Sequence, residues 1–290
     1  MNLEHFGMDT ITLAGPLEGK LKAIREGGFT HVMLNATDIA GHPGGEQAAI
    51  EAVRRSGLRV TGFQVLRDFE GLSGHLHGYK VDVAKAMLEM CHALGSRVLL
   101  ACSSTSAHAA GNPEVLKKDL QQLAMLAVPL GIRIAYEALS WGRHVNELAQ
   151  AAEIVQDADR ANLGVAIDSF HMLATGTPPD ALEAVDPGKI FLVQLSDFLW
   201  HETRTPQDRI ETARHFRVFP GEGVHSDALA DIARRLDDMG YRGDYSFEVF
   251  NDDYRNLPLA MVCERARRSV RWITSHVSRR TLPMRTKGSE

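Results

Sequence analysis

The chain has 290 residues, of which 44% are hydrophobic and 24% are charged, the proportions of an ordinary globular protein. Its formal net charge of -5 argues against a non-specific nucleic-acid-binding protein, which usually carries a basic face. The first residues do not resemble a signal peptide, and no window approaches the roughly 18 continuous apolar residues of a membrane span. The three cysteines, Cys91, Cys102 and Cys263, are too far apart for a disulfide framework and are typical of reduced thiols. We therefore expect a cytoplasmic protein with no membrane partner.

Apolar stretches of strand length alternate with amphipathic stretches of helix length along the chain. We predict strands at residues 9–14, 30–34, 58–66, 97–102, 132–137, 162–168, 189–194 and 244–248. We predict helices at residues 16–26, 45–56, 79–94, 113–130, 145–157, 227–239 and 257–276. This alternation indicates an α/β fold with a parallel sheet, and eight units predict one (β/α)8 TIM barrel domain at residues 1–278, before a polar tail at 279–290. The alternative, an open doubly wound sheet, usually has a glycine-rich phosphate turn that residues 14–19 lack.

Polar side chains end the last four predicted strands. These residues are Glu137, Asp168, Gln194 and Glu248. The carboxyl ends of barrel strands meet at one rim, and buried polar groups are costly unless they are paired or bound to a metal. Three carboxylates and one amide oxygen favour a hard divalent cation, Mg²⁺, Mn²⁺ or Co²⁺, over zinc. The alternative for each acid taken alone is a solvated rim residue.

Further candidates lie near the same predicted rim. His171, three residues after Asp168, is a candidate general base or substrate contact, with a structural histidine as the alternative. Arg67 and Arg217 are candidate anion-binding residues, because arginine binds carboxylates bidentately, and His144 is a less well-placed candidate. Two long segments without predicted secondary structure, 68–78 and 197–226, are expected to form lids or binding loops.

The chain resembles the xylose-isomerase-like barrel superfamily of sugar isomerases, epimerases and AP endonucleases. The resemblance covers nearly the whole chain. Within the superfamily, stretches 64–71, 136–146, 168–171, 191–197 and 214–223 are similar to the metal-dependent 3-dehydroshikimate dehydratases. The Asp-x-x-His element at Asp168 is shared across the superfamily, whereas Gln194 is discriminating. Sugar epimerases usually have a histidine at that strand-seven position, and the dehydratases have a glutamine.

The resemblance implies a lyase that dehydrates 3-dehydroshikimate to protocatechuate in aromatic catabolism. It implies four metal ligands, Glu137, Asp168, Gln194 and Glu248, a substrate contact from His171, and substrate-carboxylate contacts from Arg67 and Arg217. For the catalytic base that removes the proton, His171 is the first candidate and Glu248 or another rim carboxylate is the alternative. The alternative activity is that of a sugar or sugar-phosphate isomerase or epimerase. A non-catalytic metabolite-binding barrel is expected to have lost one of the four ligands. The expected partner is a small carboxylated cyclic substrate, without nucleic acid, and the sequence leaves a homo-oligomer open.

Overall fold

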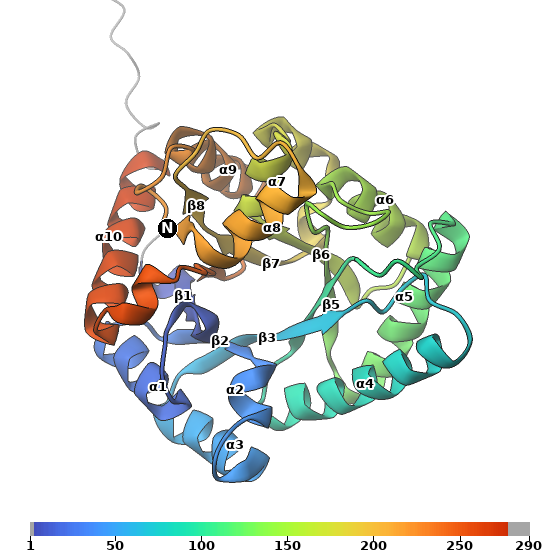
Figure 1. Ribbon diagram of the computed structural model, residues 1–290, viewed down its shortest axis with the longest axis horizontal. Helices are drawn as coiled ribbons and strands as arrows, with labels where there is room; N and C mark the ends of the chain where they lie inside the picture. The colour runs from blue at the N-terminus through green and yellow to red at the C-terminus, as the bar shows by residue number, and fades with distance from the viewer. Residues whose placement is uncertain (1–2, 278–290) are drawn as a thin grey trace, which may run out of the picture.

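A computed structural model describes residues 3–277 of the chain, so the predicted tail at 279–290 lies outside the described residues. Eight parallel strands close into a barrel in the order β1, β2, β3, β4, β5, β6, β7 and β10 (Figure 1). Their bounds are Phe6–Asp9 (β1), His31–Asn35 (β2), Arg59–Arg67 (β3), Val98–Cys102 (β4), Arg133–Glu137 (β5), Leu163–Asp168 (β6), Ile190–Leu195 (β7) and Tyr245–Phe247 (β10). The predicted (β/α)8 barrel is confirmed.

Helices surround this barrel (Figure 1). Their bounds are Leu17–Glu26 (α1), Ala36–Ala40 (α2), Gly45–Ser56 (α3), Gly74–Ala93 (α4), Pro113–Ala127 (α5), Leu148–Ala158 (α6), Ser169–Thr175 (α7), Pro206–His215 (α8), Ser226–Asp238 (α9) and Leu259–Val277 (α10). Most of the buried apolar side chains form one core in which helices pack against strands, and a smaller cluster that includes Met33, Leu100 and Ala166 comes from the other face of the strands. No helix within residues 3–277 is long and apolar enough to span a bilayer.

The first strand lies earlier than its predicted position at 9–14. Strand β1 ends at Asp9, and Thr10–Thr12 is a short 3-10 helix. The Asp9 side chain accepts a hydrogen bond from the Ile11 backbone N–H, so it ends the strand and caps the helical turn. The alternation of polar and apolar residues from Thr10 to Thr12 is typical of a strand, but these residues form a helical turn. As a consequence, Asp9 is also an acid at the carboxyl end of a barrel strand.

The two segments predicted to lack secondary structure are partly ordered into helices and strands. Helix α4 begins at Gly74 rather than residue 79, because the glycines in this stretch obscured its first turn. The segment after β7 contains α8 and a two-stranded antiparallel sheet, Asp197–Phe198 (β8) paired with Arg217–Val218 (β9). Thr205 and Asp208 form a capping box at the start of α8, a local signal that its mostly polar sequence concealed.

Candidate metal centre

The four predicted ligands come together at the carboxyl end of the barrel. Glu137 and Asp168 are the last residues of β5 and β6, and Glu248 directly follows β10. Gln194 is paired in register with Asp168 on one side and with Ser246 on the other. All four side chains are buried, with exposures of 4% for Glu137, 2% for Asp168, 0% for Gln194 and 5% for Glu248. Solvation at the rim, the alternative for each acid alone, therefore does not apply to this group.

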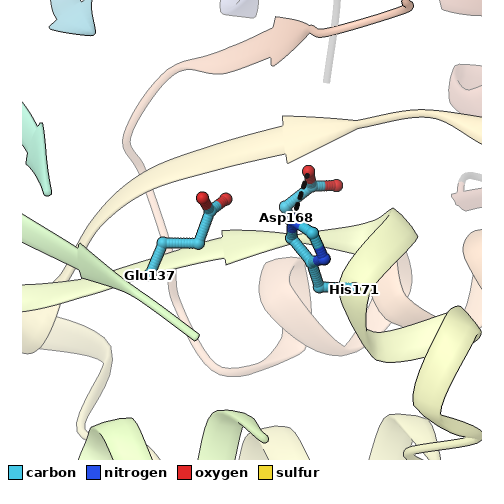
Figure 2. Close-up of side chains that lie close together, drawn as sticks. All are labelled: Glu137, Asp168 and His171. Atoms are coloured by element: carbon cyan, nitrogen blue, oxygen red, sulfur yellow. Dashed lines mark ion pairs between the residues drawn. The ribbon is translucent and has the colours of Figure 1, made fainter. Parts of the chain in front are cut away.

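Glu137, Asp168 and His171 form a compact cluster (Figure 2). One potential ligand atom from each lies within 4.8 Å of the other two. His171 Nε2 lies 3.7 Å from Asp168 Oδ2. The 3.7 Å separation is longer than a hydrogen bond, and the two carboxylates of the cluster are the groups suited to share a cation.

Several polar atoms in this group have no hydrogen-bond partner. These atoms are Glu137 Oε1 and both Oε1 and Nε2 of Gln194, all of which are buried. Burying such a group without a partner costs about 1–3 kcal/mol, so an unpaired set at one place calls for a ligand. Burial, and after it the nearby Asp168 and Glu248, raise the pKa of Glu137 to about 8. A divalent cation would satisfy the free oxygens and offset the repulsion between the acids, so the residues present fit such an ion.

Arg217 lies among the predicted ligands rather than free at the rim. Its Nη1 donates to Asp168 Oδ2 at 2.7 Å and to Glu248 Oε2 at 2.9 Å. Its Nε donates to the Ala213 carbonyl at 3.0 Å, and the guanidinium lies over the Phe170 ring, 4.4 Å from the centroid. The arginine therefore binds carboxylates of the protein, whereas the sequence predicted that it binds the substrate.

His171 lies in the first turn of α7, whose N-cap is Asp168. Its Nδ1 accepts a hydrogen bond from the Ser140 backbone N–H at 3.1 Å. The neutral ring therefore carries its hydrogen on Nε2, the nitrogen that faces Asp168. Burial lowers the pKa of His171 to about 3, so the ring is neutral at physiological pH.

A cavity of about 690 Å³, including its open mouth, lies above the cluster. Glu137, His171 and Glu248 line it, and the exposed Arg67 and Arg214 contribute to its wall. His144 is not brought into this cavity. Its Nε2 lies 2.9 Å from the Ala109 carbonyl oxygen, and its ring lines a separate hollow beside α5. The structure thus groups seven of the eight predicted site residues at this end of the barrel and leaves His144 apart.

The sequence interpretation missed three polar residues at the same end of the barrel. Asp9 is fully buried and accepts a hydrogen bond from the side chain of Gln64, which lines the cavity. The Cys102 thiol donates to Glu137 Oε2, with Sγ at 2.8 Å. The signal for Asp9, an acid that ends a strand, was hidden by the misplaced first strand. Cys102 does end a predicted strand, but a thiol there was interpreted only as part of the core.

Comparison with known proteins identifies the class to which this fold and site correspond. The profile of the xylose isomerase-like TIM barrel family matches residues 21–276, and the chain belongs to this family. It is 39% identical over 249 residues to a 3-dehydroshikimate dehydratase of Pseudomonas aeruginosa, an alignment that covers 86% of this chain. The chain spans only 38% of the length of that relative.

Two further relatives match the barrel. An inosose isomerase of Bacillus subtilis is 29% identical over 204 residues, which cover 67% of this chain and 68% of that protein. A solved xylose isomerase-like TIM barrel/4-hydroxyphenylpyruvate dioxygenase fusion protein superposes with a TM-score of 0.88 at 34% identity, and it covers 95% of this chain and 43% of that chain. The barrel thus occurs both in shorter enzymes and as one part of longer proteins.

Proposed function

We propose that this chain catalyses the dehydration of 3-dehydroshikimate to protocatechuate with Mg²⁺, Mn²⁺ or Co²⁺ held by Glu137, Asp168, Gln194 and Glu248. The observation that carries the proposal is the buried oxygen-rich group at the carboxyl ends of β5, β6, β7 and β10, with unpaired atoms on Glu137 and Gln194. The name of the Pseudomonas relative supports the substrate. The three buried free cysteines support a cytoplasmic location.

The reaction is a 1,2-elimination. A proton leaves the carbon beside the ketone, the hydroxyl group leaves the next carbon, and the two form water. Tautomerisation then gives the aromatic product, which makes the overall reaction favourable. A divalent cation at this site supplies a Lewis acid that stabilises the negative charge developing as the proton leaves.

Glu248 and His171 are our candidates for moving protons. Glu248 lines the cavity, where its carboxylate is placed to accept a proton. Burial raises its pKa to about 7 in the metal-free protein. The Nε2–H of His171 is suited to donating a hydrogen bond to the departing hydroxyl, because Nδ1 is occupied by the Ser140 N–H. This division of roles differs from the first sequence interpretation, in which His171 was the leading candidate for the base.

Arg67 is the arginine best suited to bind the substrate carboxylate. It ends β3, is exposed and lines the cavity. Arg217 already shares its guanidinium between Asp168 and Glu248, so we assign it to holding these acids in place. Ala213 and Arg214 of α8 form another part of the wall, which supports a role for the 198–226 segment in shielding the reaction from water.

Incubation of the metal-depleted protein with 3-dehydroshikimate and Mn²⁺ or Mg²⁺ tests the proposal. Protocatechuate absorbance should appear with metal and disappear on addition of EDTA. Absence of this product together with interconversion of inosose or ketose sugars would favour the isomerase alternative, which the Bacillus relative supports. Metal binding without either activity would favour a non-catalytic barrel.

A further inference from the structure

Cys102 and Glu137 form a side-chain contact between two adjacent strands. They are the last residues of β4 and β5 and lie opposite each other in the parallel register. Cys102 Sγ lies 2.8 Å from Glu137 Oε2, and both residues are 4% exposed. Both line the cavity above the candidate metal centre. The thiol is thus adjacent to the centre without belonging to the compact Glu137, Asp168 and His171 cluster.

The two oxygens of Glu137 have different surroundings. Oε2 is engaged by the Cys102 thiol, whereas Oε1 is buried without a hydrogen-bond partner. The terminal torsion of a glutamate is broad, so a carboxylate needs a second contact to fix the plane in which its oxygens lie. A thiol is a weak donor, and it is the contact that distinguishes one oxygen from the other here.

We propose that Cys102 is a positioning residue for the divalent cation, because its thiol holds Glu137 Oε2 and leaves Oε1 as the single oxygen presented to the ion. This inference rests on the metal centre of the proposed function. Metal-ligating carboxylates are generally oriented by hydrogen bonds from neighbouring groups, and loss of such a partner typically weakens metal affinity 10–100-fold. Cys102 acts through Glu137 and does not contact the ion itself.

Three variants of the 290-residue chain separate the hydrogen bond from packing. Cys102→Val keeps a side chain of similar size without a donor, and Cys102→Ser keeps a donor. Cys263→Val is the matched control, since Cys263 is a buried thiol on α10, away from the cavity. Circular dichroism and thermal unfolding in EDTA identify the folded variants and show the packing cost of each valine.

Binding of Mn²⁺ to the metal-depleted proteins, followed by the electron paramagnetic resonance signal of the free ion, is the measurement. We expect Cys102→Val to weaken the affinity by about 10–100-fold, and Cys102→Ser and Cys263→Val to stay within about threefold of the unmodified chain. The visible absorption spectrum of bound Co²⁺ should change in Cys102→Val and not in Cys263→Val. A change of that kind is not expected from a packing defect alone.

Three outcomes would overturn the inference. One is a Cys102→Val protein that binds Mn²⁺ within twofold of the unmodified chain. Another is a folded Cys102→Ser protein that loses as much affinity as Cys102→Val. The third is failure of the unmodified chain to bind Mn²⁺, which would remove the metal centre as well. If Mn²⁺ binds and depends on Cys102 but 3-dehydroshikimate is not dehydrated, the positioning role stands and only the proposed reaction fails. Should Cys102→Val not fold, Cys102→Ala takes its place, with Cys263→Ala as the control.

Discussion

The two halves of the barrel rim both bury polar side chains, but they differ in how those side chains are paired. On β1 to β3, Asp9 accepts hydrogen bonds from Ile11 and Gln64, and the Asn35 side chain accepts from Thr37. On β5 and β7, Glu137 and Gln194 keep atoms without partners. An acid or amide at the end of a strand is therefore by itself a weak indication of a metal ligand. A buried oxygen that has no hydrogen-bond partner and lies beside other acids is a stronger indication.

The difference between the two halves of the rim is clearest for Asp9 and Asp168. Each ends its strand, is buried and caps the following helical turn through Oδ1. The second oxygen of Asp9 accepts from a neutral amide, whereas that of Asp168 accepts from the Arg217 guanidinium and faces His171. Burial, the largest cause, and then the charge of Glu248 raise the pKa of Asp9 well above its usual value.

The largest expected effect follows from exchanging these two acids for their amides. Asp168→Asn keeps the cap but removes a charge from the candidate metal centre, so we expect kcat/KM to fall by about a thousandfold, the effect of removing a key electrostatic group. Asp9→Asn keeps an acceptor for the Ile11 N–H and lies outside the four candidate ligands, and we expect a loss of less than about tenfold. Steady-state dehydration and Mn²⁺ titration measure both variants. Equal losses would mean that the two halves of the rim do not differ as described.

Removal of the shared guanidinium should destabilise the metal-free protein. Arg217→Met leaves Asp168 and Glu248 buried without their cation, at an expected cost of about 3 kcal/mol in the free energy of unfolding. Urea unfolding in EDTA gives this value. Arg204→Met is the control, because Arg204 pairs with Glu202 at the exposed surface and its loss should leave the free energy of unfolding nearly unchanged. Similar unfolding energies for the two variants would exclude a bridging role for Arg217.

Glu70 is a buried acid with an unpaired oxygen that does not belong to the candidate metal centre. Its Oε1 accepts from the Ser104 N–H and the Tyr136 hydroxyl, Oε2 has no partner, and burial raises its pKa to about 7. The folded protein therefore holds the proton of this acid to a higher pH than the unfolded chain does. The resulting contribution to stability is present below a pH of about 4.5 and is lost as the pH rises towards about 7.

Glu70→Gln should remove this pH dependence while keeping an acceptor for both donors. Relative to the variant, the unmodified chain should lose about 2 kcal/mol of unfolding free energy between pH 5 and pH 8. Urea unfolding at the two pH values measures the difference. A constant gap between the two proteins across this range would show that Glu70 is ionised throughout, like an ordinary surface acid.

The smallest predicted effect concerns Arg67, the exposed arginine at the end of β3. Arg67→Ala should raise KM by about tenfold and change kcat less, since a charge-assisted hydrogen bond to the substrate carboxylate is lost in a partly solvated place. Arg214→Ala, on the other wall of the cavity, is the comparison variant. A larger rise in KM for Arg214→Ala than for Arg67→Ala would transfer the carboxylate-binding role to α8.

The amino-acid sequence by itself determined the barrel and the rim where its chemistry is expected. Alternation of apolar strands with amphipathic helices predicts a parallel sheet, and parallel strands bring their carboxyl ends to the same side. For this reason the sequence alone predicts that Glu137, Asp168, Gln194 and Glu248 lie together at this rim. Their assignment as metal ligands stays a prediction.

Only the tertiary structure decided the partners of these side chains. The contacts of Arg217 with Asp168 and of His171 with Ser140 join residues 49 and 31 positions apart. The Cys102–Glu137 contact depends on the exact register of β4 and β5, and the position of His144 depends on the path of the loop after β5. Periodicity determines which face or end of an element a residue occupies. It contains no information on loop paths or side-chain rotamers, which decide whether a buried polar atom finds a partner or remains available to a ligand.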